Sequence, residues 1–240
     1  MNDGQQITTI QKETAARPGI MMRAVQGVYG WFDDRYQITP LIEKNVTKKK
    51  VPKTLGWAAC FGGLSLLVFL VQVFTGMLLL MYYKPDPAVA WDSVTFVKSN
   101  VPMGWLVQRI HAVGANLMTA LVFMHMLRVA YYKIYRSPRE LHWISGVVLA
   151  LFTTMMAFTG YLLPWTQLSY WGAKVGTEIP GAVPVIGSQM VEWVRRGKAI
   201  SGDTLGFFFA LHIWILPAVL SGFMGMHFMM IRRTGISRPL

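Results

Sequence analysis

Four long stretches of this chain contain no charged residue, and they constrain its fold more than any other feature. These stretches cover residues 54–83, 110–127, 141–173 and 204–231. The hydrocarbon core of a bilayer is ~30 Å thick, and ~20 helical residues are needed to cross it. With 53% hydrophobic and 14% charged residues, the composition excludes a soluble globular domain. The sequence predicts an all-α membrane protein with a bundle of four transmembrane helices. The expected spans are residues 55–82, 104–130, 142–164 and 207–231.

The lysine and arginine residues are unevenly distributed over the connecting segments. Of these 23 residues, 16 lie before the first span, between the second and third, or after the fourth, and seven lie on the other side. Since positively charged loops stay on the cytoplasmic side, we expect both termini there, on the n side. The loop 165–206 is then expected on the opposite, p side. The formal charge of +12 thus reports membrane topology and does not indicate nucleic-acid binding.

The regions outside the spans differ in composition. Residues 1–24 are polar and are expected to be a mobile extension, followed by an n-side interfacial segment over 25–54 and the four-helix domain over 55–240. The first 53 residues contain no apolar core of signal-peptide length, so we expect them to be retained. In the p-side loop, residues 165–190 predict short helices on the membrane surface, whereas 191–203 predict a solvated turn.

Four of the five histidines form two pairs in the second and fourth spans. His111 and His125 are 14 residues apart, and His212 and His227 are 15 apart. On an α-helix, 14 residues span about 21 Å and return to within roughly 40° of the starting face, and 15 residues to within roughly 60°. Each helix therefore carries one imidazole near each membrane surface. Because the two spans run parallel, His111 is expected to face His212 at the p side, and His125 to face His227 at the n side.

Two facing imidazoles can supply both axial ligands of a haem iron, and two such levels predict two stacked haems within the bundle. An iron with two histidine ligands has no open position, so it suits electron transfer better than chemistry at the metal. The alternative is that these histidines are hydrogen-bonded helix-packing residues. The fifth histidine, His142, begins the third span, has no expected partner at its depth, and is predicted to be interfacial.

Four glycines in the first and third spans repeat the histidine period. Gly62 and Gly76 are 14 residues apart, as are Gly146 and Gly160. Lacking a Cβ, glycine lets a backbone approach a flat macrocycle closely, so these residues are expected to pack against haem faces at the same two levels. Ordinary packing of small residues between helices is the alternative interpretation.

Several short motifs carry a resemblance to a known family. They are Val28-Tyr29-Gly30-Trp31-Phe32, Val51-Pro52, Cys60-Phe61-Gly62-Gly63, Pro138-Arg139-Glu140-Leu141, Gly160-Tyr161-Leu162-Leu163-Pro164-Trp165, Pro184-Val185-Ile186-Gly187-Ser188 and Gly235-Ile236-Ser237. From about Tyr29 onward, the chain resembles the cytochrome b6 branch of the cytochrome b family. That branch forms the four-helix N-terminal half of a split cytochrome b in b6f and menaquinol-type bc complexes. The 15-residue spacing in the fourth span is similar to this branch.

The resemblance assigns cofactors to particular residues. It implies that His111 and His212 ligate a p-side haem b, and that His125 and His227 ligate an n-side haem b. It also implies that Cys60 bonds covalently to a third, c-type haem on the n side. Cys60 is the only cysteine, which excludes a disulfide framework or an iron–sulfur site on this chain. A buried, inert thiol is the alternative for Cys60.

The same resemblance points to candidate propionate partners. Arg232 matches an arginine near the n-side haem propionates, and Arg128 and Arg109 are weaker candidates.

The chain also departs from the family near the first ligand. Gln108 stands where b6 chains usually have arginine, and Ala112 and Val113 replace the usual Arg-Trp, which leaves the p-side propionate partners open. In the p-side loop, Gly172 matches the glycine of the quinol niche, and a turn or packing glycine is the alternative.

The function implied by the resemblance is electron transfer within a quinol:cytochrome c (or plastocyanin-type acceptor) oxidoreductase. Electrons would pass from p-side quinol oxidation to n-side quinone reduction, with proton translocation and with the n-side haem at the higher potential. No Pro-Glu-Trp-Tyr motif occurs in the sequence, so the chain is not expected to act alone. The implied partners are a three-helix protein like subunit IV that carries this motif, a Rieske iron–sulfur protein, a c-type cytochrome and membrane lipid, in a homodimeric complex. A bacterial plasma membrane is favoured over a thylakoid.

Two other classes of protein remain open at this stage. A dihaem b membrane anchor could pass electrons between a peripheral dehydrogenase and quinone. A transporter or channel without a cofactor would use the same four spans but would be colourless.

Overall fold

The computed structural model describes residues 20–36, 39–40, 43 and 56–235. Three long helices have the bounds α4 Phe61–Leu80, α6 Gly104–Tyr131 and α7 Glu140–Leu162. The fourth runs without a break over Gly202–Thr234. Its parts are α10 Gly202–Ala210, a π-helix Leu211–Ile215 and α11 Leu216–Thr234. The predicted all-α fold with four membrane spans is confirmed, and the described residues include no strand.

Shorter helices lie before and between the four long ones. They are α2 Ile20–Tyr36, a 3₁₀ turn Trp57–Cys60, α5 Ala90–Asn100, α8 Gln167–Glu178, a 3₁₀ turn Ile179–Ala182 and α9 Gly187–Arg195. The first span is shorter than expected at its start, because the 3₁₀ turn occupies the residues up to Cys60. Helix α5, between the first two spans, was not expected from the sequence.

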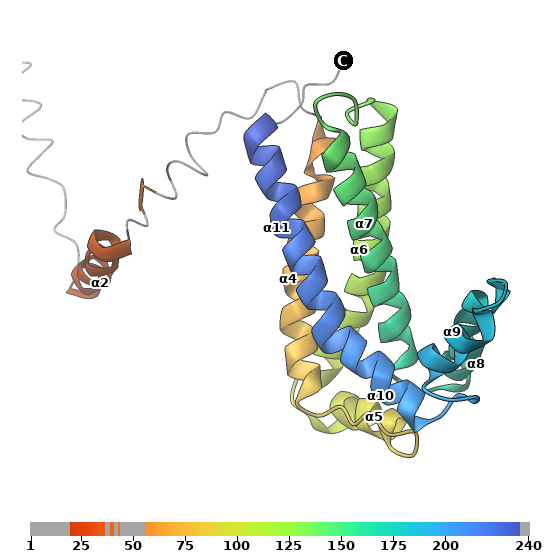
Figure 1. The fold of residues 1–240 in the computed structure, drawn as a ribbon. Helices are drawn as coiled ribbons and strands as arrows, with labels where there is room; N and C mark the ends of the chain where they lie inside the picture. The colour runs from red at the N-terminus through yellow and green to blue at the C-terminus, as the bar shows by residue number, and fades with distance from the viewer. Residues whose placement is uncertain (1–19, 37–38, 41–42, 44–55, 236–240) are drawn as a thin grey trace, which may run out of the picture. The chain divides into compact units, whose positions relative to one another are not determined.

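The four long helices pack side by side as a bundle (Figure 1). Helix α4 packs against α6, α6 against α7, and α7 against α11. The start of α4, the turn between α6 and α7 and the end of α11 lie at one end of the bundle, and α5, α8 and α9 lie at the other (Figure 1). This arrangement brings both histidine-bearing helices into contact with glycine-bearing ones.

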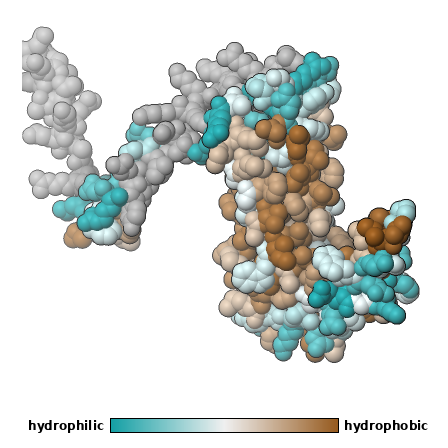
Figure 2. Space-filling view, in the orientation of Figure 1, coloured by the Kyte–Doolittle hydropathy of each residue, from teal (hydrophilic) through white to brown (hydrophobic). Residues whose placement is uncertain are grey.

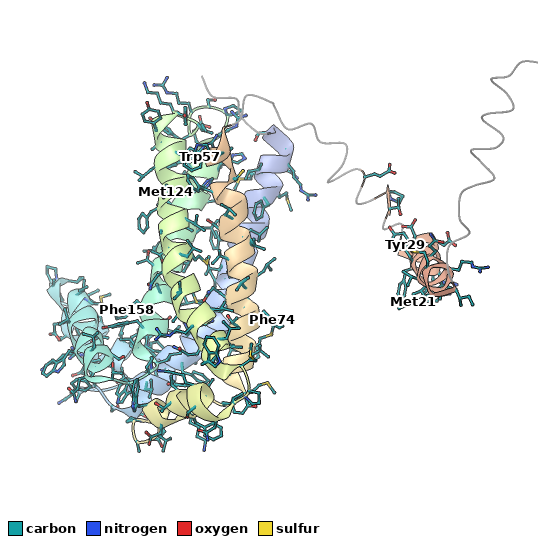
Figure 3. The ribbon with its side chains drawn as sticks, turned by 180° about the vertical axis from the view of Figure 1, so that it is seen from behind. Met21, Tyr29, Trp57, Phe74, Met124 and Phe158 are labelled. Carbon is teal, nitrogen blue, oxygen red and sulfur yellow. The ribbon has the colours of Figure 1, made fainter. Side chains whose placement is uncertain are left out.

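Large apolar side chains cover the outside of the bundle (Figure 2). Phe74 is 60% exposed and Met124 is 44% exposed, on helices α4 and α6 (Figure 3). In water such a surface would be unfavourable, whereas lipid tails solvate it. Hydrophilic residues gather near the two ends of the long helices in the same view (Figure 2). The outer surface is therefore the part of the bundle that faces lipid.

A small apolar core fixes the short helix α8 to the bundle. Leu162, Ala173 and Phe208 are buried together, from α7, α8 and α10, and Phe158 packs against them. Helix α8 begins at Thr166, whose side chain accepts a hydrogen bond from the backbone N–H of Ser169 at 3.1 Å. Such a cap satisfies one of the unpaired N–H groups at a helix start.

Another link joins the ends of α4 and α7. The Tyr83 hydroxyl donates to the Leu163 carbonyl at 2.7 Å. Burial raises the pKa of the Tyr83 phenol, so it remains a neutral donor.

The expectation of a solvated turn over 191–203 is wrong at its beginning. Helix α9 extends to Arg195, whose side chain is buried. Its Nε donates to Thr177 Oγ1 at 2.8 Å, and one terminal nitrogen donates to the Lys174 carbonyl and to Glu178. All of these bonds go to α8. Arg195, which was expected to be solvated, therefore joins α9 to α8.

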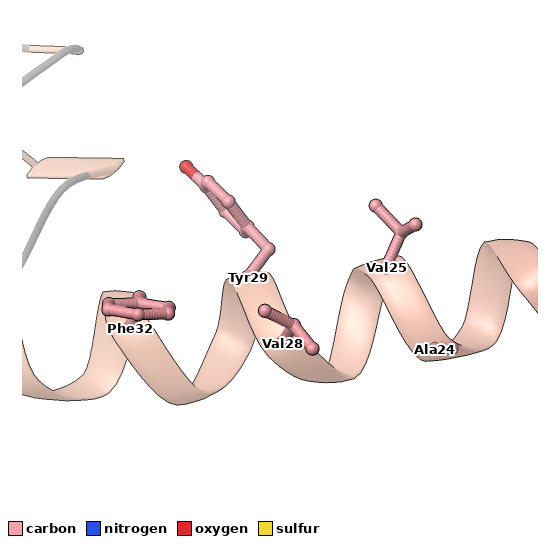
Figure 4. A pocket seen from close by; sticks show the side chains of 5 residues that line it. All are labelled: Ala24, Val25, Val28, Tyr29 and Phe32. Atoms are coloured by element: carbon pink, nitrogen blue, oxygen red, sulfur yellow. The ribbon is translucent and has the colours of Figure 1, made fainter.

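The described residues up to Glu43 belong to a separate unit from the described residues 56–235. Within it, α2 begins at Ile20, so a helix starts inside the segment expected to be polar and mobile. A shallow apolar groove on this helix is lined by Ala24, Val25, Val28, Tyr29 and Phe32 (Figure 4). Residues 1–19 and the motif residues Val51-Pro52 and Ile236-Ser237 lie outside the described residues.

Candidate functional site

Helix α6 and the π-helical part of the fourth span bring the imidazoles of His111 and His212 together inside the bundle. The centroids of the two rings are 6.3 Å apart, and their planes are 78° from parallel. Two imidazoles on one metal ion, each with a metal–nitrogen bond of ~2.0 Å, have centroids about 6 Å apart. The separation of these two rings is therefore compatible with a metal ion bound between them.

The second pair, His125 and His227, lies one level away along the same helices. His125 lies against Gly62 of α4, and His227 lies against Gly146 of α7. His227 also contacts His142, with 6.3 Å between ring centroids and 70° between planes. The expectation that His142 has no partner at its depth is therefore wrong, because the first turn of α7 packs against α11 at the level of His227. His142 Nε2 is also 3.2 Å from Thr234 Oγ1.

The π-helix at Leu211–Ile215 explains the unequal histidine spacings. The backbone N–H of Leu216 bonds to the Leu211 carbonyl, five residues earlier. A π-turn takes up roughly one residue more than an α-turn. Fifteen residues through the π-turn thus cover about the same rotation as 14 residues of α6. The imidazoles of the two helices can then match at both levels, although their spacings in sequence differ.

Each of the four glycines lies against one of the four imidazoles. A Cβ added at Gly160 would be 2.6 Å from His212 Cε1, and one at Gly76 would be 3.2 Å from His111 Cε1. A Cβ at Gly62 would be 3.1 Å from His125 Cε1. The fourth, at Gly146, would be 3.6 Å from His227 Cε1. The shared 14-residue period therefore corresponds to direct contacts between glycine backbone and imidazole.

The residue before three of these glycines is a buried hydroxyl bonded to the same imidazole. Thr75 Oγ1 is 2.9 Å from His111 Nδ1, Thr159 Oγ1 is 3.0 Å from His212 Nδ1, and Ser145 Oγ is 2.8 Å from His227 Nδ1. Sequence reasoning missed these residues. The available signal was a Ser-Gly or Thr-Gly pair at three of the four positions of the glycine period.

These hydroxyls favour a proton on Nδ1 of each ring. Each has a single hydrogen and donates it to a carbonyl of its own helix, at 2.7 Å for Thr75, 3.1 Å for Thr159 and 2.9 Å for Ser145. With that hydrogen used, the hydroxyl oxygen is available to accept from Nδ1–H. In these three imidazoles, Nε2 is left with the lone pair that a metal needs.

The fourth imidazole has different surroundings. His125 Nδ1 is buried and has no hydrogen-bond partner among the described residues. The residue before Gly62 is Phe61, which is buried and packs edge-on against Trp57.

The described residues also contain no cluster of three or more His, Cys, Asp or Glu side chains that could hold a metal ion.

The site's residues fit a pair of haems. Each level has two histidines, with His111 and His212 6.3 Å apart at one of them, the glycines let each ring lie close to a helix backbone, and three rings have a hydroxyl beside Nδ1, which favours an unprotonated Nε2.

Cys60 lies just before α4, two residues before the glycine that contacts His125. Its side chain is exposed and is in no disulfide. The interpretation of Cys60 as a buried, inert thiol is therefore wrong. An exposed thiol at this end of the bundle is open to covalent attachment.

The arginine candidates have different positions. Arg109 is exposed and lies roughly 200° around α6 from His111, whereas Gln108 lies about 60° from it. Arg128 stacks on Tyr132, with its guanidinium 5.6 Å from the ring centroid. Arg232 is in the last turn of α11. The structure therefore places two of the three arginines at the same end of the bundle as the His125 level.

The structure also gives the positions of the two residues that follow His111 and of the glycine in the predicted quinol niche. Ala112 and Val113 are exposed on α6. A Cβ at Gly172 would lie 2.9 Å from Tyr161 Cε1. Gly172 is thus needed for the close packing of α8 on α7, whatever else this position does.

Comparison with known proteins places these features in a wider group. Residues 46–235 match the family described as Cytochrome b/b6/petB. Cytochrome b6 of Synechococcus elongatus is 42% identical over 213 residues, which are 89% of this chain and 99% of that protein. Cytochrome b6 of Prochlorococcus marinus is also 42% identical, over 89% of this chain and 97% of that protein.

A solved structure is similar as well. It is described as a hyperthermophilic respiratory Complex III, with a TM-score of 0.82 and 39% sequence identity. The match covers 88% of this chain but 56% of the solved one. The chain therefore spans about half the length of that structural relative.

Proposed function

Because the chain belongs to the cytochrome b family, we propose that it is an electron-transfer subunit of a quinol:cytochrome c (or plastocyanin-type acceptor) oxidoreductase. The observation that carries the proposal is the pair of His111 and His212 imidazoles with ring centroids 6.3 Å apart, together with a second pair of histidines further along the same two helices. Two such levels span most of the bilayer, which is what transport of electrons from one surface to the other requires.

Family membership implies b haems, and we assign their ligands to the four paired histidines. His111 and His212 would hold the p-side haem, and His125 and His227 the n-side haem. When bound, the haems supply one-electron transfer at irons whose coordination is complete. The protein's part is to orient the rings through Thr75, Ser145 and Thr159 and to leave space at the glycines.

Charged and reactive side chains at the n-side end suit further roles. Arg128 and Arg232 are proposed to pair with haem propionates, since guanidinium groups bind carboxylates in a bidentate manner. Cys60, exposed near the level of His125, is proposed to hold a third, c-type haem. Electrons that reach this end would then reduce quinone on the n side.

The p-side quinol site is proposed to be shared with another protein. Gly172 and its surroundings would form one part, and a three-helix partner carrying Pro-Glu-Trp-Tyr the other. A Rieske protein and a c-type cytochrome would take the electrons that leave on this side, in a homodimeric complex of a bacterial plasma membrane. Quinol oxidation here, with quinone reduction opposite, would translocate protons.

The alternative is a dihaem b anchor for a peripheral dehydrogenase. It uses the same histidines but requires neither Cys60 nor a quinol site on the p side. Affinity purification of the tagged chain from its own membranes separates the two proposals. Recovery of a Rieske protein supports the first, and recovery of a dehydrogenase supports the second.

The ligand assignment is tested by reduced-minus-oxidised spectra of membranes that contain the complex. We expect His212→Ala to remove about half of the b-haem absorbance, because the p-side iron loses one axial ligand. His142→Gln is the matched control, since this histidine also lies in a span but is not assigned as a ligand. Full absorbance in His212→Ala, or equal loss in both variants, would contradict the assignment.

The covalent haem is tested separately on a denaturing gel stained for haem peroxidase activity. A stained band at the mass of this chain, 27.1 kDa, should be present in the wild type and absent in Cys60→Ser. An unstained wild-type band together with normal b haems would leave the dihaem core in place but remove the third haem.

A further inference from the structure

The four paired imidazoles differ in their hydrogen bonding, and the difference follows the two levels. In the p-side pair, each Nδ1 is hydrogen-bonded to a buried threonine hydroxyl, of Thr75 for His111 and of Thr159 for His212. In the n-side pair, His227 Nδ1 is hydrogen-bonded to the Ser145 hydroxyl. His125 Nδ1 has no partner within the part of the chain that the structure describes. The p-side level therefore has two such bonds and the n-side level has one.

The cause of the asymmetry lies in one residue of α4. At each level the hydroxyl precedes a glycine that contacts the ring, in the pairs Thr75-Gly76, Ser145-Gly146 and Thr159-Gly160. The corresponding pair for His125 is Phe61-Gly62. A phenylalanine cannot accept the Nδ1 proton. The position before the glycine is thus a hydroxyl residue at three of the four sites and Phe61 at the fourth.

A hydrogen bond from Nδ1–H gives the imidazole more anionic character and makes it a stronger electron donor through Nε2. A more electron-rich axial ligand stabilises the oxidised iron and lowers its reduction potential, and such outer hydrogen bonding is one of the means by which proteins tune haem. Two bonds at one level and one at the other should separate the potentials of the two levels.

We propose that Thr75, Thr159 and Ser145, with Phe61 in the fourth position, set the order of the two haem potentials, the p-side haem being the lower. These four are positioning and tuning residues that act through the ligands. The inference rests on the proposed function, since it assumes a haem at each level. Its direction suits that function, because an electron that moves toward a negative n side must climb ~2.3 kcal/mol per 100 mV.

The experiment is a potentiometric titration of the b-haem absorbance in membranes that contain the whole complex. Thr75→Val keeps the shape of the side chain and removes the acceptor, so the p-side midpoint should rise while the n-side midpoint stays in place. Thr75→Ser keeps the hydroxyl and should restore the wild-type value. If the substitution weakens the preference for the oxidised iron tenfold, the midpoint potential rises by 59 mV, because the couple transfers one electron.

The n-side haem provides the reciprocal test. Ser145→Ala should raise the n-side midpoint alone, and Ser145→Thr should restore it. If Thr75→Val does not retain its haem, Thr159→Val removes the acceptor from the opposite ligand of the same iron and should also raise the p-side midpoint. The double variant Thr75→Val/Thr159→Val should bring the two midpoints closer together.

Failure of this inference differs from failure of the proposed function. Loaded variants whose midpoints match the wild type would overturn the inference, as would a wild-type p-side haem with the higher potential. The His212→Ala spectrum identifies which component is the p-side haem. Membranes with no pair of b-type components would instead contradict the proposed function itself.

Discussion

Three of the four glycines beside the imidazoles leave too little room for a methyl group, and Gly160 leaves the least. A Cβ there would come within 2.6 Å of His212 Cε1. We expect Gly160→Ala to push the imidazole away from its partner, at a cost of about 1–3 kcal/mol for overpacking. Reduced-minus-oxidised spectra should show loss of the p-side haem component and retention of the other.

The control for this substitution is a glycine with open space around it. Gly222 lies on the exposed face of α11 and has nothing within 4 Å of an added Cβ. Gly222→Ala should keep both haems, because alanine favours a helix over glycine. A normal spectrum in Gly160→Ala would show that the close approach to His212 is unimportant.

Among the elements, the π-helix in the fourth span has the clearest consequence. It takes up one residue, so removal of one residue from it should leave a regular α-helix with the 14-residue spacing of α6. We expect deletion of Ile215, which is 52% exposed, to preserve both haems. Purified complex should show the wild-type ratio of b haem to protein.

Deletion of a similarly exposed residue from α6 is the matched comparison. Leu117 is 48% exposed and lies between His111 and His125, in a helix without a π-turn. Its removal turns one imidazole about 100° relative to the other, so one haem should be lost. Equal loss of haem in the two deletion variants would contradict the role given to the π-helix.

For the whole molecule, the distribution of positive charge predicts the orientation in the membrane. Asn100 and Arg136 are exposed at opposite ends of the bundle. In a Cys60→Ser background, a membrane-impermeant maleimide added to intact cells should label Asn100→Cys and leave Arg136→Cys unlabelled. Detergent-solubilised protein should react at both positions, and the reverse pattern in cells would place the termini on the p side.

The sequence by itself determined the four spans, the two levels of paired histidines and the glycine period that accompanies them. Each depends on local regularities, namely the length of uncharged segments and the rotation of an α-helix, that do not require knowledge of the packing. Residues such as His111 and Gly76 could therefore be assigned to a shared level before any contact between them was known.

Only the tertiary structure decided how those levels are built. The hydrogen bonds of Thr75, Ser145 and Thr159 join helices that are far apart in sequence. Arg195 was expected to be solvated, but its hydrogen bonds to α8 accompany its burial. The π-turn changes helix phase without any charge or polarity signal. Such features arise from hydrogen bonds that form when helices pack, because buried polar groups need partners that the local sequence does not name.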